Sequence, residues 1–190
     1  MRLTGERVVL RHPEPADADS YLRWFNDPEV VRFLRRSRPM GRVEEEEFLR
    51  GLAQRKDDVI WLIEAREGGL PIGSCGLHGS GGPDRKAELG IAIGEREYWS
   101  RGYGREVVGL LLAYGFDVLN LHRIGLSVFE YNERGRRCYE RAGFRLEGRR
   151  REAKFMDGRY WDELEMGVLA CEWRADKVAS REEFPVLASA

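Results

Sequence analysis

Residues 98–105, YWSRGYGR, place two glycines at the start of an apolar helix. Residues 87–93 upstream are typical of a strand, so the order is strand, glycine-containing loop, helix. Gly102 and Gly104 allow the backbone to turn until successive N–H groups face one point, at the positive end of the helix dipole. Such a group of N–H donors binds anions, most often phosphate. We therefore predict a phosphate-binding loop in this stretch.

The loop fits neither of the two common nucleotide-binding motifs. A Walker loop ends in Gly-Lys-Ser/Thr, which the sequence lacks. A Rossmann fingerprint requires a third glycine at the position of Val107, and residues 94–101 separate the strand from the glycines. A solvated loop whose glycines only begin a helix is the alternative to an anion site.

The histidines and cysteines, which could also act as catalytic or metal-binding residues, do not suggest a second site. The histidines are His12, His78 and His122. No two share a helix face and none has triad-like neighbours, so we expect neither a metal site nor a hydrolase. The cysteines are Cys75, Cys138 and Cys171, and their number and spacing fit free thiols in a reducing compartment rather than metal ligands. We interpret Cys138 as a packing residue.

Length and composition indicate one soluble globular domain. Of 190 residues, 34% are charged and 42% hydrophobic, and the formal net charge is −1. This balance provides no basic field for nucleic acid or membrane partners. We find no apolar signal segment at the start and no run of membrane-spanning length, so we expect a cytoplasmic location. We assign 1–173 to the domain and 174–190 to a flexible tail, in which residues 184–187 could dock.

The elements that must position the loop follow from hydrophobic periodicity. We expect strands at residues 7–11, 59–65, 71–77, 86–93, 122–130, 144–154 and 160–169. Helices are expected from about residue 15 to 25, over 43–52 and 133–141, and after the glycine loop, with a short turn at 30–34. In the helix after the loop, Val107, Leu111, Tyr114 and Val118 recur on one face, which should pack on the sheet. The basic loop at 35–42 is either a solvated linker or a contact for ligand phosphates or an acidic substrate.

This order of elements resembles the GNAT acyltransferase family, and particular motifs support the resemblance. Residues 101–104, RGYG, resemble the core of the family's pyrophosphate loop, although Trp99 stands where Gln or Arg is usual. Residues 132–144, NERGRRCYERAGF, are similar to the family's motif that runs from Asn through Tyr to Gly-Phe. Residues 24–30 and 157–163 are similar to the RimJ/RimL branch, which includes enzymes that acetylate ribosomal-protein N-termini and small amines.

The resemblance implies the fold and the cofactor. It implies an α+β, three-layer fold whose mixed, mostly antiparallel sheet has about six to seven strands, is splayed at the acyl-CoA site and is flanked by about four helices. Acetyl-CoA is then the co-substrate, without a metal, and its pyrophosphate lies on the loop while its pantetheine arm pairs with the preceding strand. Asn132 would hold that arm or an ordered water, although an Asn here also suits a helix N-cap. The other residues implied in cofactor binding are Ile91, Ala92, Ile93, Trp99, Ser100, Arg101, Gly102, Tyr103, Gly104 and Arg105.

The same resemblance implies two catalytic side chains. Tyr139 would protonate the departing thiolate, because a phenol of pKa ~10 can donate to a thiolate of pKa ~8.5. Its alternative role is that of a core aromatic residue on an amphipathic helix. Glu88, on the strand beside the thioester, would serve as general base through water, and its alternative role is that of a solvent-facing strand residue.

The identity of the acceptor amine is open from the sequence. We prefer a protein N-terminal amine, and keep as alternatives a small amine, such as a polyamine or aminoglycoside, and a non-catalytic acyl-CoA-binding module. An amine of pKa ~10.4 costs roughly 4.6 kcal/mol to deprotonate at pH 7, and an α-amine of pKa ~7.8 only about 1 kcal/mol. An N-terminal acceptor therefore needs less help from a base. Dimers are common in the family that the chain resembles, so a homodimer is one possibility, and the sequence leaves the oligomeric state open.

Overall fold

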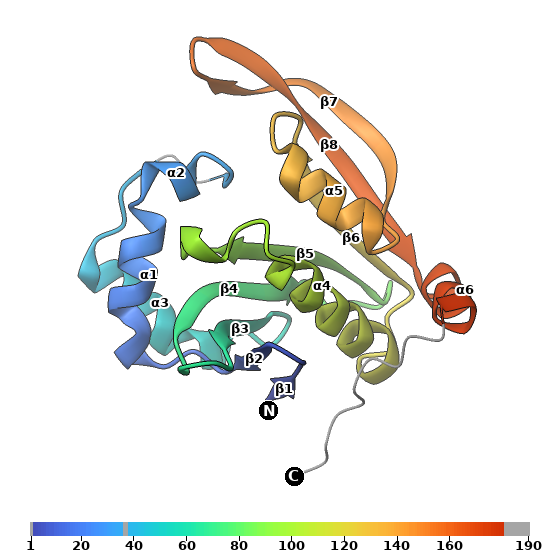
Figure 1. Ribbon diagram of the computed structural model, residues 1–190, viewed down its shortest axis with the longest axis horizontal. Helices are drawn as coiled ribbons and strands as arrows, with labels where there is room; N and C mark the ends of the chain where they lie inside the picture. Colours follow the sequence, from blue (N-terminus) through green and yellow to red (C-terminus); the bar gives the residue numbers. More distant parts are fainter. Residues whose placement is uncertain (1, 36–37, 181–190) are drawn as a thin grey trace.

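The computed structural model describes residues 2–35 and 38–180, which form one mixed sheet flanked by helices (Figure 1). The sheet has eight strands in the order β1-β2-β3-β4-β5-β6-β8-β7. Every neighbouring pair in the described chain is antiparallel except β5 and β6, which are parallel. The strands are β1 Leu3–Thr4, β2 Val8–Arg11, β3 Val59–Ala65, β4 Pro71–His78, β5 Lys86–Ile93, β6 Arg123–Phe129, β7 Arg145–Met156 and β8 Arg159–Leu169.

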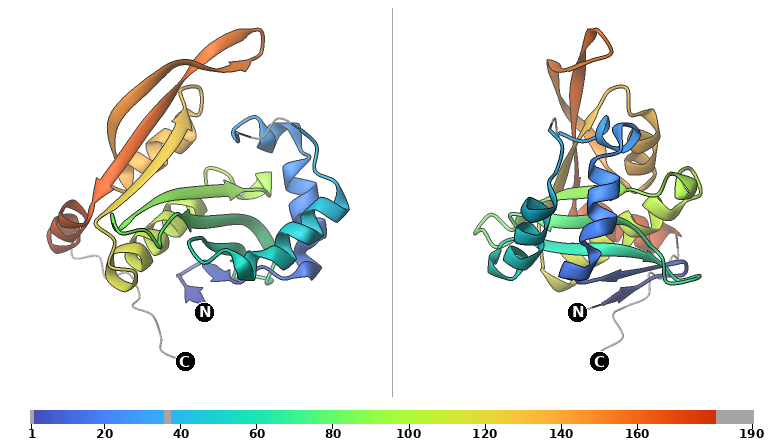
Figure 2. Two further views of the ribbon diagram at one scale, coloured as in Figure 1. Left: turned by 180° about the vertical axis from the view of Figure 1, so that it is seen from behind. Right: turned by 90° about the vertical axis from the view of Figure 1, so that its left-hand side faces the viewer.

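Helices cover both faces of the sheet (Figure 2). The α-helices are α1 Ala18–Phe25, α2 Pro28–Val31, α3 Arg42–Gly51, α4 Tyr103–Ala113, α5 Glu133–Arg141 and α6 Ala170–Ser180. Short 3-10 turns occupy Pro15–Asp17, Leu52–Gln54 and Arg96–Tyr98. Helices α4 and α5 lie side by side over one face, α1 and α3 lie on the other, and the β7–β8 hairpin projects beyond the body of the domain (Figures 1 and 2).

Side chains of the inner strands point alternately to the two faces of the sheet, so the hydrophobic core has one part under α4 and α5 and another under α1 and α3. On β3, Trp61 and Ile63 join the larger core, which contains the apolar residues of α4. Leu62, between them, faces the opposite way and packs with residues of α1 and α3, such as Tyr21 and Leu49. Successive strand side chains point to opposite faces, so a run of consecutive buried residues is expected in a sheet covered on both sides.

The parallel pairing of β5 and β6 is short. It joins Lys86 to Arg123, Ala87 to Ile124 and Glu88 to Gly125, and then ends. Strand β5 continues to Ile93, paired only with β4 along that stretch, and β6 continues to Phe129, paired with β8. The two strands therefore separate beyond Glu88 and Gly125. This confirms the splayed sheet that the resemblance implied.

Several boundaries differ from the sequence analysis. The sheet has one strand more than expected because the two-residue β1 is too short to show periodicity. The apolar helix face predicted to pack on the sheet does not extend to Val118, whose side chain is exposed. The reason is that α4 passes into a π-helical segment at Tyr114–Val118. A π-turn has more residues per turn, so it rotates the later positions away from the sheet.

The structure describes the first part of the predicted tail. Helix α6 runs through Ser180, so residues 174–180 are helical; its beginning packs through the buried Ala170 and Trp173. Residues 181–190, including the 184–187 stretch expected to dock, lie outside the described residues. None of the described helices has the length and apolar character needed to cross a bilayer.

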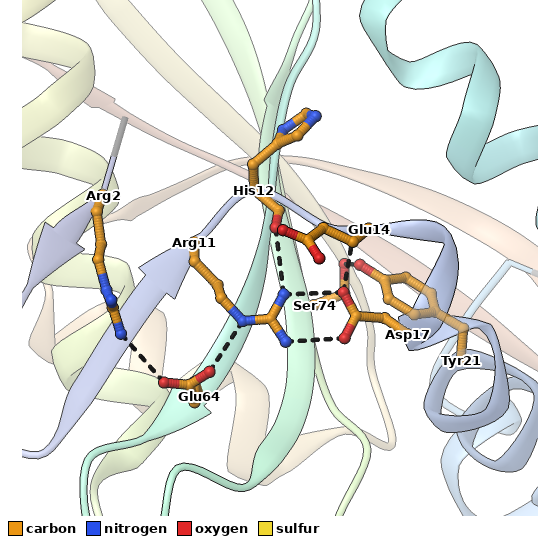
Figure 3. Close-up of polar contacts among 8 residues, drawn as sticks. All are labelled: Arg2, Arg11, His12, Glu14, Asp17, Tyr21, Glu64 and Ser74. Atoms are coloured by element: carbon orange, nitrogen blue, oxygen red, sulfur yellow. Dashed lines mark hydrogen bonds and ion pairs between the residues drawn. The ribbon is translucent and has the colours of Figure 1, made fainter.

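A buried ion pair fixes the first helical segment to the sheet (Figure 3). Arg11, at the end of β2, donates from both terminal nitrogens to Asp17, each at 2.8 Å, and from Nε to Glu64 of β3. Asp17 also accepts from the backbone N–H of Glu14 at 2.8 Å. Burial alone would raise the pKa of Asp17, but these hydrogen bonds and the charge of Arg11 hold its pKa below the ordinary value.

We predict that Asp17→Asn destabilises the fold by about 2 kcal/mol at pH 7, because hydrogen bonds to a buried charged group contribute this much. A lowered folded-state pKa gives stability that is present above the unfolded value, near ~3.9, and lost as pH falls through the folded value. The gap between wild type and variant should therefore close below about pH 4. Urea unfolding from pH 7 to pH 2.5 measures both quantities.

The matched control is Asp19→Asn in α1, because Asp19 pairs with Arg42 but its side chain is 73% exposed. An exposed ion pair contributes little to stability, so this variant should unfold like the wild type. Equal stability of Asp17→Asn and wild type at pH 7 would contradict the role of the buried pair.

Candidate active site

A cleft of about 1180 Å³ opens where β5 and β6 separate. We call its helical side the helix wall; it carries Arg105 of α4 and Arg134, Arg137, Cys138, Tyr139 and Arg141 of α5. We call its opposite side the strand wall; it carries Glu88, Arg123, Ser127, Glu147, Arg150, Glu163 and Glu165. The residues that close the cleft above β6 include Phe33, Leu34 and Arg35, which follow α2.

The glycine loop forms one rim of the cleft, with Ser100, Gly102 and Gly104 among its lining residues. Gly102 is the N-cap of α4 at φ 87°, and Ser100 also has a positive φ of 58°. Left-handed backbone at this point turns the chain into the helix. As at any helix start, the first N–H groups of α4 have no acceptor within the helix. A side chain at Gly104 would lie 3.8 Å from Cys138 Sγ, an ordinary contact, so the fold itself does not require glycine there.

An arginine from the start of the chain fixes this loop, a role that the sequence analysis missed. Arg7 Nη1 donates to the Arg101 carbonyl at 2.8 Å, and Arg7 Nε donates to Glu106 Oε2 at 3.1 Å. Glu106 Oε1 accepts from the backbone N–H groups of Arg7 and Val8 at 2.8 and 3.3 Å. The guanidinium also lies 5.1 Å from the ring centre of Tyr103. We call this set the Arg7–Glu106 brace.

Aromatic side chains cover the rim beside the loop. Trp99 Nε1 donates to the Ile93 carbonyl at 2.7 Å, which ties the loop to the last residue of β5. The guanidinium of Arg134 lies 3.8 Å from the Trp99 ring centre, and Phe33 meets the same ring edge-on at 6.0 Å. Burial lowers the pKa of Arg134, while this stacking on an aromatic face stabilises the cation. No sequence signal linked Phe33 to the site, and Arg134 was included only as part of the 132–144 motif, without a role of its own.

Helix α5 positions Asn132 and Tyr139 in the cleft. The Asn132 side chain accepts from the Gly135 N–H at 3.0 Å, so it caps α5, as its alternative role predicted. Tyr139 packs against Phe144 and its hydroxyl makes no hydrogen bond to another described residue. Burial raises the pKa of Tyr139 well above its ordinary value, with only partial opposition from the charge of Arg134. The phenol is therefore a protonated donor facing the cleft.

Glu88 stands at the point where the strands separate. Its strand neighbours Ala87 and Leu89 belong to the core beneath α4, so Glu88 points to the opposite face of the sheet. A side chain at Gly125 would meet Glu88 Oε1 at 2.8 Å, so the missing Cβ leaves room for this carboxylate. Burial raises the pKa of Glu88, and the charges of Arg123 and Arg35 oppose that shift only in part.

Arginines neutralise the other carboxylates of the strand wall. The ion pairs are Arg35–Glu163 at 2.7 Å, Arg150–Glu165 at 2.5 Å and Arg123–Glu147. Arg35 also donates to Ser127 Oγ at 3.0 Å. Glu88 forms no ion pair with any residue that the structure describes, so it is the carboxylate of this wall available to a ligand cation.

The structure brings most of the predicted site residues to one cleft. Those lining it are Glu88, Ile91, Ala92, Ile93, Trp99, Ser100, Gly102, Gly104, Arg105, Asn132 and Tyr139. Arg101 and Tyr103, also predicted to bind cofactor, are not lining residues, because their contacts are with Arg7 and, for Tyr103, Tyr98 on the outer side of the loop. In the basic loop, Arg35 reaches the strand wall and Arg38 pairs with Glu44, while residues 36–37 lie outside the described residues.

Comparison with known proteins identifies the family. The acetyltransferase (GNAT) domain matches residues 7–145. The chain belongs to the GNAT family. The uncharacterized N-acetyltransferase YoaA of Bacillus subtilis (strain 168) is 32% identical over 164 residues, which are 84% of this chain and 92% of YoaA.

Two further similar proteins have names that state an acceptor. YdaF of Bacillus subtilis (strain 168), a candidate ribosomal N-acetyltransferase, is 31% identical over 57% of this chain and 59% of its own length. The structure of spermidine N-acetyltransferase from Vibrio cholerae in complex with CoA and spermine superposes with a TM-score of 0.82 at 27% identity, and covers 88% of this chain and 98% of that one. These similarities confirm the GNAT fold, an acetyl-CoA-dependent N-acetyltransferase activity and acetyl-CoA as the co-substrate.

We predict that Arg7→Met weakens CoA binding about tenfold, because the loop loses charge-assisted hydrogen bonds that hold its amides in place. Since the brace lies outside the cleft, kcat at saturating acetyl-CoA should change less than about twofold. Calorimetry with CoA and steady-state kinetics measure the two effects. The control is Arg2→Met, because Arg2 is 60% exposed, pairs with Glu64 of β3, and neither residue lines the cleft. Unchanged CoA affinity in folded Arg7→Met would show that the brace does not position the loop.

Proposed function

We propose that this N-acetyltransferase acts on an acceptor with a single amine, and that a protein N-terminal α-amine is its natural substrate, as in the RimJ/RimL branch. The observation that carries the proposal is the charge of the strand wall. A polyamine brings several positive charges, and each needs a carboxylate that no other cation already neutralises. In the strand wall, arginines pair with three carboxylates, and Glu88 is left for one ammonium group.

The faces from which acetyl-CoA and the acceptor amine would enter the cleft also support an N-terminal amine as the acceptor. The glycine loop and α4 lie on one face of the sheet, and Glu88 points to the other face. An acetyl-CoA bound at the loop would thread its pantetheine arm between the separated strands, with the open edge of β5 at Ile91, Ala92 and Ile93 as its backbone partner. The thioester then meets the acceptor at the face where Glu88 lies. A backbone N–H of β5 at this point would stabilise the oxyanion that forms during acyl transfer.

A small-amine acceptor is the second candidate. One observation favours it: the superposed Vibrio cholerae enzyme is a spermidine N-acetyltransferase bound to CoA and spermine. YdaF, the candidate ribosomal enzyme, favours the first candidate. A non-catalytic acyl-CoA-binding module would need the glycine loop but no proton donor, whereas Tyr139 faces the cleft with its hydroxyl protonated. We place the reaction in the cytoplasm, where the free thiols of Cys75, Cys138 and Cys171 are stable.

Tyr139 is the proposed acid. When the tetrahedral intermediate collapses, the C–S bond breaks and the electron pair stays on sulfur, so a nearby proton lowers the barrier. Burial raises the pKa of Tyr139, so the phenol is protonated at pH 7 and can donate its proton. Its hydroxyl, bonded to no other described residue, can turn toward the sulfur.

We predict that Tyr139→Phe lowers kcat about 10²- to 10⁴-fold, because it removes the proton and keeps the ring. CoA affinity should stay nearly unchanged, since the phenol acts on the leaving group and not on the phosphates. Pre-steady-state thiol release and CoA calorimetry measure both. Full turnover in Tyr139→Phe would mean that water or another group protonates the sulfur.

Glu88 is the proposed base, acting directly or through one water. Its raised pKa makes it a stronger base than an ordinary carboxylate, and it must be ionised to act. An α-amine with pKa ~7.8 is already partly neutral at pH 7, so a weak base suffices. A Lys or polyamine amine near ~10.4 would depend on this base far more.

We predict that, with a peptide N-terminus as acceptor, Glu88→Gln reduces kcat/KM only modestly at pH 7, and that the deficit shrinks as pH rises to 8.5. With a polyamine acceptor the deficit should be severe and persist over that range. A panel of peptides, polyamines and aminoglycosides, assayed by thiol release between pH 6.5 and 8.5, provides the measurement. Preference for spermidine together with a persistent deficit would overturn the N-terminal assignment, and superimposable profiles would remove Glu88 from the mechanism.

A further inference from the structure

The two walls of the cleft differ in charge. The helix wall carries four arginines, Arg105, Arg134, Arg137 and Arg141. The four carboxylates among the described lining residues all belong to strands, so the residues that line the helix wall are positive or uncharged. The helix wall is therefore a cationic surface directly beside the glycine loop.

Three of these arginines form a stripe along α5. Arg134, Arg137 and Arg141 are spaced at i, i+3 and i+7, which places them on one face of the helix. Cys138 belongs to the same face, and its sulfur lies 3.8 Å from the position of a side chain at Gly104. The middle of the stripe thus lies against the loop, and Arg141 lies about one helical turn farther along.

The three arginines differ in the partners they already have. Arg134 stacks on Trp99. Arg137 pairs with Glu133 on the same helix, but the two side chains are 62% and 68% exposed, so water screens this pair and little is lost when it opens. Arg141 forms no ion pair with any residue that the structure describes. Arg137 and Arg141 can therefore bind an additional anion.

The cofactor has such an anion. Beyond its pyrophosphate, which the glycine loop would receive, CoA carries a phosphate on the 3′-oxygen of its ribose. We propose that Arg137 and Arg141 bind the 3′-phosphate of CoA and make this enzyme select CoA over 3′-dephospho-CoA. This inference rests on the proposed position of the pyrophosphate at the loop. Guanidinium groups suit the role because they bind phosphate oxygens through paired N–H donors.

The position of Arg141 in the last turn of α5 also stabilises the helix, because a cation there complements the negative end of the helix dipole. That effect concerns folding and is the same with either ligand. Selection between the two ligands depends on contact with the 3′-phosphate. The two roles are therefore separable by measuring stability and ligand preference in the same variants.

The experiment compares CoA with 3′-dephospho-CoA by calorimetry at fixed ionic strength for wild type, Arg137→Gln, Arg141→Gln and the double variant. We expect wild type to bind CoA at least tenfold more tightly than 3′-dephospho-CoA, since charge-assisted bonds to phosphate have this strength. Each single variant should reduce the ratio several-fold, and the double variant should bring it near unity. Affinity for 3′-dephospho-CoA should stay constant.

Arg50→Gln is the matched control, because Arg50 also pairs with a Glu one turn earlier on an exposed helix, but it does not line the cleft. It should leave the ratio unchanged, and thermal unfolding of every variant shows that each is folded. Equal binding of both ligands by wild type, or variants that weaken both ligands equally, would overturn the proposal and leave the acetyltransferase assignment intact. Failure of wild type to bind either ligand would instead contradict the cofactor site itself.

Discussion

The site depends on a parallel strand pairing that lasts for three residues. Beyond Glu88 and Gly125, β5 and β6 no longer exchange hydrogen bonds, and the open edge of β5 faces the cleft. Buried backbone N–H and C=O groups are almost always paired, so this edge is suited to a ligand that presents amides of its own. The pantetheine arm of CoA has two amides. The interruption of the sheet therefore both opens the cleft and supplies its hydrogen-bonding groups.

The same interruption divides the chemistry between two faces. Positive charge is concentrated on the α4 and α5 side, at the glycine loop, the first turn of α4 and the arginines of α5. The proposed base, Glu88, is on the other side, where it is the carboxylate without an arginine partner among the described residues. In the proposed mechanism the cofactor and the acceptor approach from opposite faces, and each face carries the charge that its own ligand requires.

Much of this organisation could be predicted from the sequence, and the reasons for the misses are local. The strands, the glycine loop and α5 follow from periodicity and motif spacing, and residues 132–144 led to the family. Contacts between distant segments could not be found in this way: Arg7 is far from Glu106 in the chain, and nothing about its type among many arginines marks it. Val118 was misplaced because periodicity assumes a constant helical turn. The homodimer stays a prediction.

The Arg7–Glu106 brace also links the glycine loop to the local stability of the N-terminal strands. Its contacts join residues 94 to 99 positions apart, and β2, which follows Arg7 directly, is held in the sheet by its pairing with β3. Loss of that pairing would release Arg7 from the loop, so local opening of the N-terminal strands and loosening of the loop are coupled. A ligand that binds only the braced loop would therefore stabilise the N-terminal strands by mass action.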